Sequence, residues 1–109
     1  IVMTAGVGPF SYDGTWATVV FYVTTLDFQL IEGAEAEGTW NYEDRRGRLK
    51  HKTVTETSDP DGLVTIKTRF KGTTPLEFCI DDITKPGYIY VAGPLACTST
   101  VVPAASGAF

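Results

Sequence analysis

The residues of this 109-residue chain that could perform acid–base chemistry are few. His51 is the only histidine, and it lies in a strand-like stretch between Lys50 and Lys52, without the partnered cleft that general-base catalysis needs. Glu35 and Glu37 would share one strand face about 6.6 Å apart, near the spacing of glycosidase carboxylates. An open sheet surface would not split their pKa values, so we interpret them as solvated and predict no enzyme.

Two other acidic pairs could contact a cation. Asp59 and Asp61 have a calcium-like spacing, but the third acidic ligand and the distal Glu of a calcium loop are missing. A turn, with Pro60 at its second position and Gly62 after it, is the simpler interpretation. Asp81 and Asp82 could join a surface calcium site, although their spacing does not require one. We therefore expect no cofactor, with structural calcium as the open alternative.

Aromatic side chains are the stronger functional signal. The chain has two Trp, five Tyr and six Phe. Flat rings offer a large apolar area with little side-chain entropy to lose, and they tolerate water at a polar tip. This combination suits the apolar faces and hydroxyl rims of sugars, and outward Thr, Lys and Arg side chains would add hydrogen bonds. The predicted ligand-binding residues are Trp16, Tyr22, Val20, Tyr12, Tyr42, Tyr88, Lys67 and Arg69.

The stretch 16–25 must position the central rings of this set. Its β-branched and aromatic residues favour a strand, whose side chains alternate between two faces. One face is wholly apolar and consists of Ala17, Val19, Phe21 and Val23. The other carries Trp16, Val20 and Tyr22, where an ordinary half-exposed strand would carry polar residues. Either residues 1–12 or a loop covers this second face, or it is an aromatic platform for a ligand.

The rest of the chain supports an all-β fold. Sixteen threonines and turn signals every eight to twelve residues predict an antiparallel β-sandwich, Ig-like or jelly-roll-like, without significant helix. We expect strands over 34–42, 49–57, 63–70, 76–81, 88–91 and 97–102. The predicted core contains Val19, Phe21, Trp40, Ile66, Phe78 and Ile80, with Leu76 also facing inward. Residues 1–102 form the predicted domain, and residues 103–109 the predicted linker.

The net charge limits the classes of possible partner, and the cysteines bear on the compartment. A net charge of −4 and a pI near 4.8 argue against nucleic acid, and no apolar run approaches the length of a membrane span. We expect Cys79 and Cys97 to form a disulfide, which implies an oxidising compartment; the alternative is two buried free thiols. The only basic cluster contains Arg45, Arg46, Arg48, Lys50 and Lys52. We interpret it as a solvated edge strand that resists edge pairing.

The order of these signals resembles a known group of modules. Trp16 opens one strand, Gly38-Thr39-Trp40 ends the next, Asp59-Pro60-Asp61-Gly62 precedes Val64-Thr65-Ile66, and 76–83 leads to Tyr88-Ile89-Tyr90. Over residues 3–102 the chain resembles the bacterial Ig-like and fibronectin-like accessory modules of secreted hydrolases. It looks most like a carbohydrate-binding module of family 81 from a bacterial cellulase. In that pattern Thr or Ser typically occupies the outer positions where this chain has Val20 and Tyr22.

The resemblance implies a function. A monomeric, secreted, noncatalytic module would bind β-glucan (cellulose, xyloglucan or mixed-linkage glucan) and hold an attached glycoside hydrolase on its substrate. The alternative is an Ig-like spacer or adhesion domain with no glycan ligand. The motifs that carry the resemblance are mostly structural, so they bear more on fold than on function.

Overall fold

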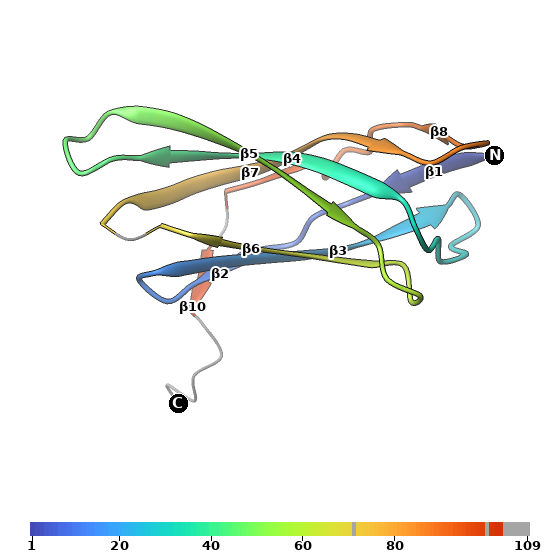
Figure 1. Cartoon of the computed structure of the whole chain (residues 1–109), viewed down its shortest axis with the longest axis horizontal. Coiled ribbons are helices and arrows are strands. Elements are labelled where there is room, and N and C mark those ends of the chain that lie inside the picture. The colour runs from blue at the N-terminus through green and yellow to red at the C-terminus, as the bar shows by residue number, and fades with distance from the viewer. Residues whose placement is uncertain (71, 100, 104–109) are drawn as a thin grey trace.

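The computed structural model describes residues 1–70, 72–99 and 101–103, and it confirms the all-β prediction. Two sheets pack face to face as a β-sandwich (Figure 1). The six-stranded sheet contains β1 (Val2–Ala5), β2 (Phe10–Tyr12), β3 (Trp16–Thr25), β6 (Leu63–Arg69), β8 (Ile89–Tyr90) and β10 (Val101–Pro103). The four-stranded sheet contains β4 (Glu35–Glu43), β5 (Leu49–Thr57), β7 (Thr74–Thr84) and β9 (Cys97–Thr98). No helix of the described residues has the length and hydropathy that crossing a membrane requires.

Strand β3 is the centre of its sheet, as its composition predicted. On one side it pairs with β6 from Trp16 to Tyr22. On the other side it pairs with β2 near its start and with β1 near its end. The N-terminal segments therefore lie beside β3 in the plane of the sheet and not over its outer face.

Two strand pairs differ from the antiparallel arrangement that we expected. Strand β8 runs parallel to β1, and β10 runs parallel to β2. The expected single strand over 97–102 is also divided, because β9 pairs with β7 in one sheet while β10 pairs with β2 in the other. Pro103, which we assigned to the linker, is the last residue of β10, and 104–109 lie outside the described residues.

The predicted core is confirmed. Its six members are all buried between the sheets: Val19, Phe21, Trp40, Ile66, Phe78 and Ile80. Trp40 is fully buried, and the centroids of the Phe10, Phe70 and Phe78 rings lie 5.1, 5.3 and 4.9 Å from its own. Its indole Nε1–H donates to the Thr68 hydroxyl at 2.9 Å, so its one polar group is paired inside the core.

The prediction for Leu76 was wrong. Its side chain is 38% exposed, whereas Pro75 and Phe78 are buried. The register of β7 against β4 shifts between Asn41 and Tyr42. Such a bulge adds one residue to a strand and reverses the alternation of its side chains on one side of the irregularity.

Cys79 and Cys97 form a disulfide, as we expected. It joins two neighbouring strands of the four-stranded sheet, because Cys79 of β7 and Cys97 of β9 are partners in the ladder. The link fixes the short β9 against the long β7.

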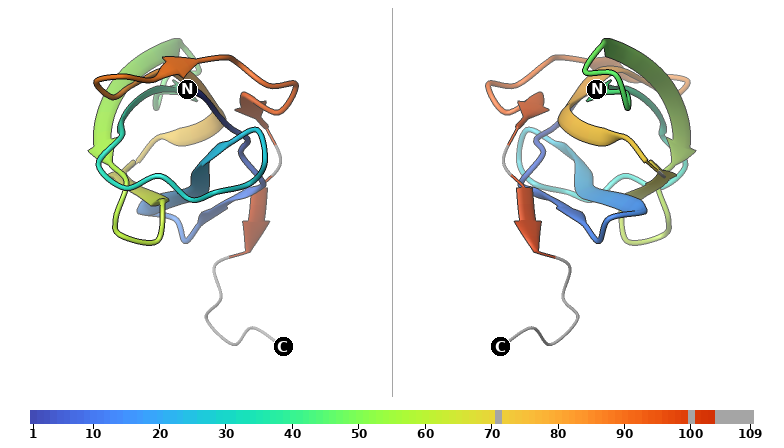
Figure 2. Two further views of the ribbon diagram at one scale, coloured as in Figure 1. Left: turned by 90° about the vertical axis from the view of Figure 1, so that its right-hand side faces the viewer. Right: turned by 90° about the vertical axis from the view of Figure 1, so that its left-hand side faces the viewer.

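Strand β5 is the edge of the four-stranded sheet, and it bends along one side of the sandwich (Figure 2). Lys52 is not simply solvated, contrary to our expectation for the basic cluster. It pairs in register with Trp40 and points to the core side. Its Nζ lies 5.0 Å from the Phe70 ring centroid and donates to the Arg69 carbonyl at 3.3 Å. An inward-pointing lysine is one device by which edge strands avoid further pairing.

Candidate ligand-binding face

The outer face of β3 is open. Trp16, Val20 and Tyr22 are 39%, 47% and 53% exposed, whereas Val19 and Phe21 between them are buried. The interpretation that residues 1–12 cover this face is therefore wrong, because β1 and β2 lie beside β3 and leave its outer side chains in solvent.

Strand β6 adds polar and cationic groups beside these rings. Arg69 pairs in register with Trp16, and Lys67 pairs with Thr18, so both cations lie beside the first residues of β3. The Lys67 Nζ lies 5.1 Å from the Trp16 ring centroid, within the range of a cation–π contact. Thr65 pairs with Val20 and is exposed. The prediction that Lys67 and Arg69 flank the aromatic strand is confirmed in position.

A tight turn holds Trp16 at the start of β3. The Asp13 carboxylate accepts hydrogen bonds from the backbone N–H groups of Trp16 at 2.7 Å and Thr15 at 2.9 Å. Gly14 has a φ of +97°, a conformation that L side chains rarely adopt. The N–H groups of Trp16 and Thr15 hold the pKa of the Asp13 carboxyl below its ordinary value of 3.8, and the Lys67 ammonium acts in the same direction.

The Asp13 turn predicts a dependence of stability on pH. Because the folded-state pKa is lowered, the contribution of Asp13 is fully present above pH 3.8 and is lost as pH falls through the lowered value. Asp13→Asn removes the titration, so the variant should be less stable than wild type at pH 7. The difference should shrink below pH 3.8. Chemical denaturation of both proteins between pH 7 and pH 2 measures it, and a difference that does not change with pH would contradict the role of the carboxylate.

The three remaining predicted tyrosines do not join this face. Tyr12 is half-buried, and its hydroxyl donates to the Thr73 carbonyl at 2.8 Å. Tyr42 packs against the core with its ring centroid 5.3 Å from that of Phe70. We expected both at turns or on outer faces, but both side chains face the core side, because Tyr12 pairs with the inward Ala17 and Tyr42 follows the inward Trp40 by two residues.

Tyr88, also half-buried, lies at a separate groove of about 670 Å³ near the start of β8. Tyr90 lines the same groove, and its hydroxyl oxygen is buried with no hydrogen-bond partner in the described part of the chain. Burial, and then the negative charge of Asp82, raise the pKa of the Tyr90 hydroxyl. No residue of β3 lines this groove, although Ile89 of β8 does.

The open face extends further than the sequence indicated. Val2 of β1 faces outward and pairs in register with Ile89 of β8, and Ile89 and Val91 are exposed. We missed this extension because it depends on the parallel pairing of β1 with β8. Phe28, at 85% exposure and with a φ of 66°, is a further exposed aromatic residue, which we did not single out. It lies in the turn after β3.

Asp81 and Asp82 lie on β7 of the other sheet, whereas Asp59 and Asp61 lie in the turn that leads to Leu63, the ladder partner of Tyr22. Asp81 accepts a hydrogen bond from the Thr39 hydroxyl at 2.5 Å, and Asp82 accepts one from the Ile83 N–H at 2.9 Å. Asp59 accepts from the N–H groups of Asp61 and Leu63, at 2.9 and 3.0 Å, which confirms the predicted turn.

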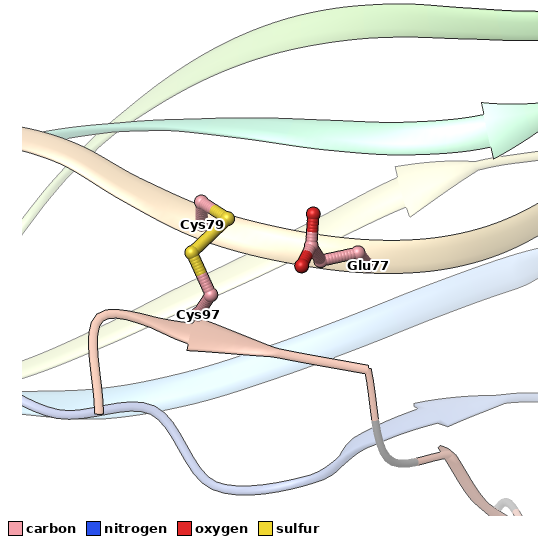
Figure 3. Close-up of side chains that lie close together, drawn as sticks. All are labelled: Glu77, Cys79 and Cys97. Carbon is pink, nitrogen blue, oxygen red and sulfur yellow. A yellow bond between two sulfur atoms is a disulfide. The ribbon is translucent and has the colours of Figure 1, made fainter. Parts of the chain in front are cut away.

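His51, Glu35 and Glu37 lie on the exposed side of the four-stranded sheet. Glu35 and Glu37 are exposed, as we expected. The His51 Nδ1 lies 2.6 Å from the Asn41 Oδ1, and the Asn41 amide donates to Glu77 at 2.8 Å. The Glu77 carboxylate and the sulfurs of Cys79 and Cys97 lie within 4.8 Å of one another (Figure 3). Those sulfurs are joined as a disulfide, so they are not thiolate ligands.

A scan against protein-family models found no match to this chain, and a search of curated proteins found no similar sequence.

Proposed function

We propose that this chain is a noncatalytic carbohydrate-binding module that binds an extended β-glucan along β3. The observation that carries the proposal is the exposure of Trp16, Val20 and Tyr22 in one line on a central strand. Trp16 and Tyr22 are six residues apart, which corresponds to about 20 Å along a strand. That length suits several consecutive sugar rings better than one small molecule.

The surroundings of these rings support the same function. Thr65 is the partner of Val20 across the ladder and Thr18 precedes Val20 by two residues on the same face of β3, so both would supply hydroxyl groups for hydrogen bonds with sugar hydroxyls. The rings belong to a strand that is paired on both sides, so a ligand would meet a preformed surface and little ordering cost would oppose binding. The Cys79–Cys97 disulfide is compatible with a secreted module that is attached to a glycoside hydrolase.

Affinity electrophoresis against a panel of polysaccharides tests the proposal. We expect cellulose derivatives, xyloglucan or mixed-linkage glucan to retard the native protein, and α-linked glucans such as starch to leave its mobility unchanged. Bovine serum albumin serves as the non-binding reference in each gel. Retardation by none of the polysaccharides would contradict the proposal and support the Ig-like spacer instead.

A further inference from the structure

We infer that the β3 face binds β-glucan chains that carry anionic groups, carboxylate or sulfate, more tightly than neutral chains, because these groups meet Lys67 and Arg69. This inference rests on the proposed function and names the class of its ligand. Its basis is the distribution of charge between the two sheets, together with the position of these two cations.

The two sheets differ sharply in charge. The six strands of the sheet around β3 contain two charged residues, Lys67 and Arg69, and no acidic residue. In the four-stranded sheet, β4 contains three glutamates, β5 one, and β7 one glutamate and two aspartates, against Lys50 and Lys52. The strands of the sheet around β3 thus carry only cations, although Asp13, Asp27, Asp59 and Asp61 lie in the turns at the ends of β3 and β6.

Both cations are available to a ligand. Lys67 and Arg69 are exposed, and neither forms an ion pair within the described ranges. The charge of Lys67 helps to lower the pKa of the Asp13 carboxyl. The Asp13 Oδ1 accepts two backbone hydrogen bonds in the turn before Trp16, and no ion pair joins this carboxylate to Lys67 or Arg69 within the described residues.

The geometry fits a charged substituent on a stacked sugar. Neighbouring strands lie about 4.8 Å apart, and Arg69 is the direct partner of Trp16 across the ladder. A carboxylate or sulfate at the edge of a ring stacked on Trp16 would therefore lie over β6. The planar guanidinium of Arg69 can bind such an anion through two parallel N–H···O bonds, and Lys67 adds a second charge beside the Trp16 ring.

Polymers with the same backbone and different charge test this inference. The full chain is titrated with hydroxyethyl-cellulose, carboxymethyl-cellulose and cellulose sulfate, and dissociation constants are measured at 20 mM and 300 mM NaCl. We expect the anionic polymers to bind about tenfold more tightly than the neutral one at low salt. The ratio should fall at high salt, because screening weakens exposed charge pairs. The two anionic arms distinguish carboxylate from sulfate.

Two double variants localise the effect. Lys67→Gln with Arg69→Gln should bring the anionic-to-neutral affinity ratio close to one. Arg46→Gln with Lys50→Gln changes the net charge of the protein equally, but at the other sheet and its turn, and should leave the ratio at its wild-type value. An anionic-to-neutral affinity ratio near one in the wild type would overturn the inference. If the neutral polymer still bound in that case, the proposed function would stand.

Other outcomes also decide the matter. An equal fall of the ratio in both double variants would show an effect of overall charge and would overturn the inference. Retention of anionic polymer after Trp16→Ala and Tyr22→Ala would show adsorption without sugar stacking, with the same consequence. Failure of all three polymers to bind would contradict the proposed function itself.

Discussion

Replacement of Trp16 and Tyr22 by alanine is expected to abolish measurable glucan binding while the protein remains folded. Each exposed ring offers apolar area to a sugar, and truncation of such an anchor costs about 1–3 kcal/mol. Since 1.4 kcal/mol is a factor of ten in affinity, each single variant should bind about 5- to 150-fold more weakly, and the double variant more weakly still. Affinity electrophoresis and the thermal midpoint are measured on all three variants.

Phe28→Ala is the matched control, because Phe28 is an exposed aromatic residue in the turn beyond the end of β3. This variant should keep the wild-type affinity. Wild-type affinity in the Trp16 and Tyr22 variants would refute the role of the β3 face. The groove lined by Tyr88 and Tyr90 would then be the next candidate binding site.

Trp40→Ala is expected to have the largest effect on stability. It removes the largest fully buried side chain, which contacts three phenylalanine rings between the two sheets. Truncation of a buried Trp costs about 3–5 kcal/mol through lost burial and the remaining cavity. It also leaves the buried Thr68 hydroxyl without the indole donor. Denaturant unfolding measures the change in the free energy of unfolding.

Two milder variants separate the contributions at this site. Trp40→Phe keeps an aromatic ring but loses the N–H donor, and Thr68→Val removes the acceptor. A double-mutant cycle between them isolates the coupling, for which we expect about 0.5–1.5 kcal/mol. A loss below about 1 kcal/mol for Trp40→Ala would contradict its central place in the core.

The strands and the core could be predicted because local alternation encodes them. In β3 the buried alternate side chains are all apolar, and in β6 Val64 and Ile66 continue this pattern while the third buried position is Thr68. The charged and Gly-containing turns between strands marked the ends of β4, β5 and β6. The sequence alone did not decide whether Trp16, Val20 and Tyr22 are exposed or covered, because that depends on where residues 1–12 and the neighbouring loops lie.

The errors share a physical cause, which is dependence on distant partners. Leu76 was assigned to the core because its alternation continues to Phe78, and a bulge against β4 has no local signature in the sequence. Tyr12 belongs to a three-residue strand that is too short to show which face is inward until its pairing with β3 is known. The extension of the platform to Ile89 depends likewise on a parallel pair whose members are far apart in the sequence.

The parallel pairing of β2 with β10 determines how the domain would respond to tension. A pull between the two ends of the chain draws β2 back toward the N-terminus and β10 forward toward the C-terminus, so their ladder is loaded in shear. In shear several hydrogen bonds carry the load together, whereas peeling breaks them one after another. Pulling between the two ends should therefore need a higher rupture force than pulling across the turns that follow β3 and β6. Equal rupture forces in single-molecule force spectroscopy would refute this expectation. Under such tension the β2–β10 ladder at the edge of the sheet would resist unfolding while the β3 face remained bound to its polymer.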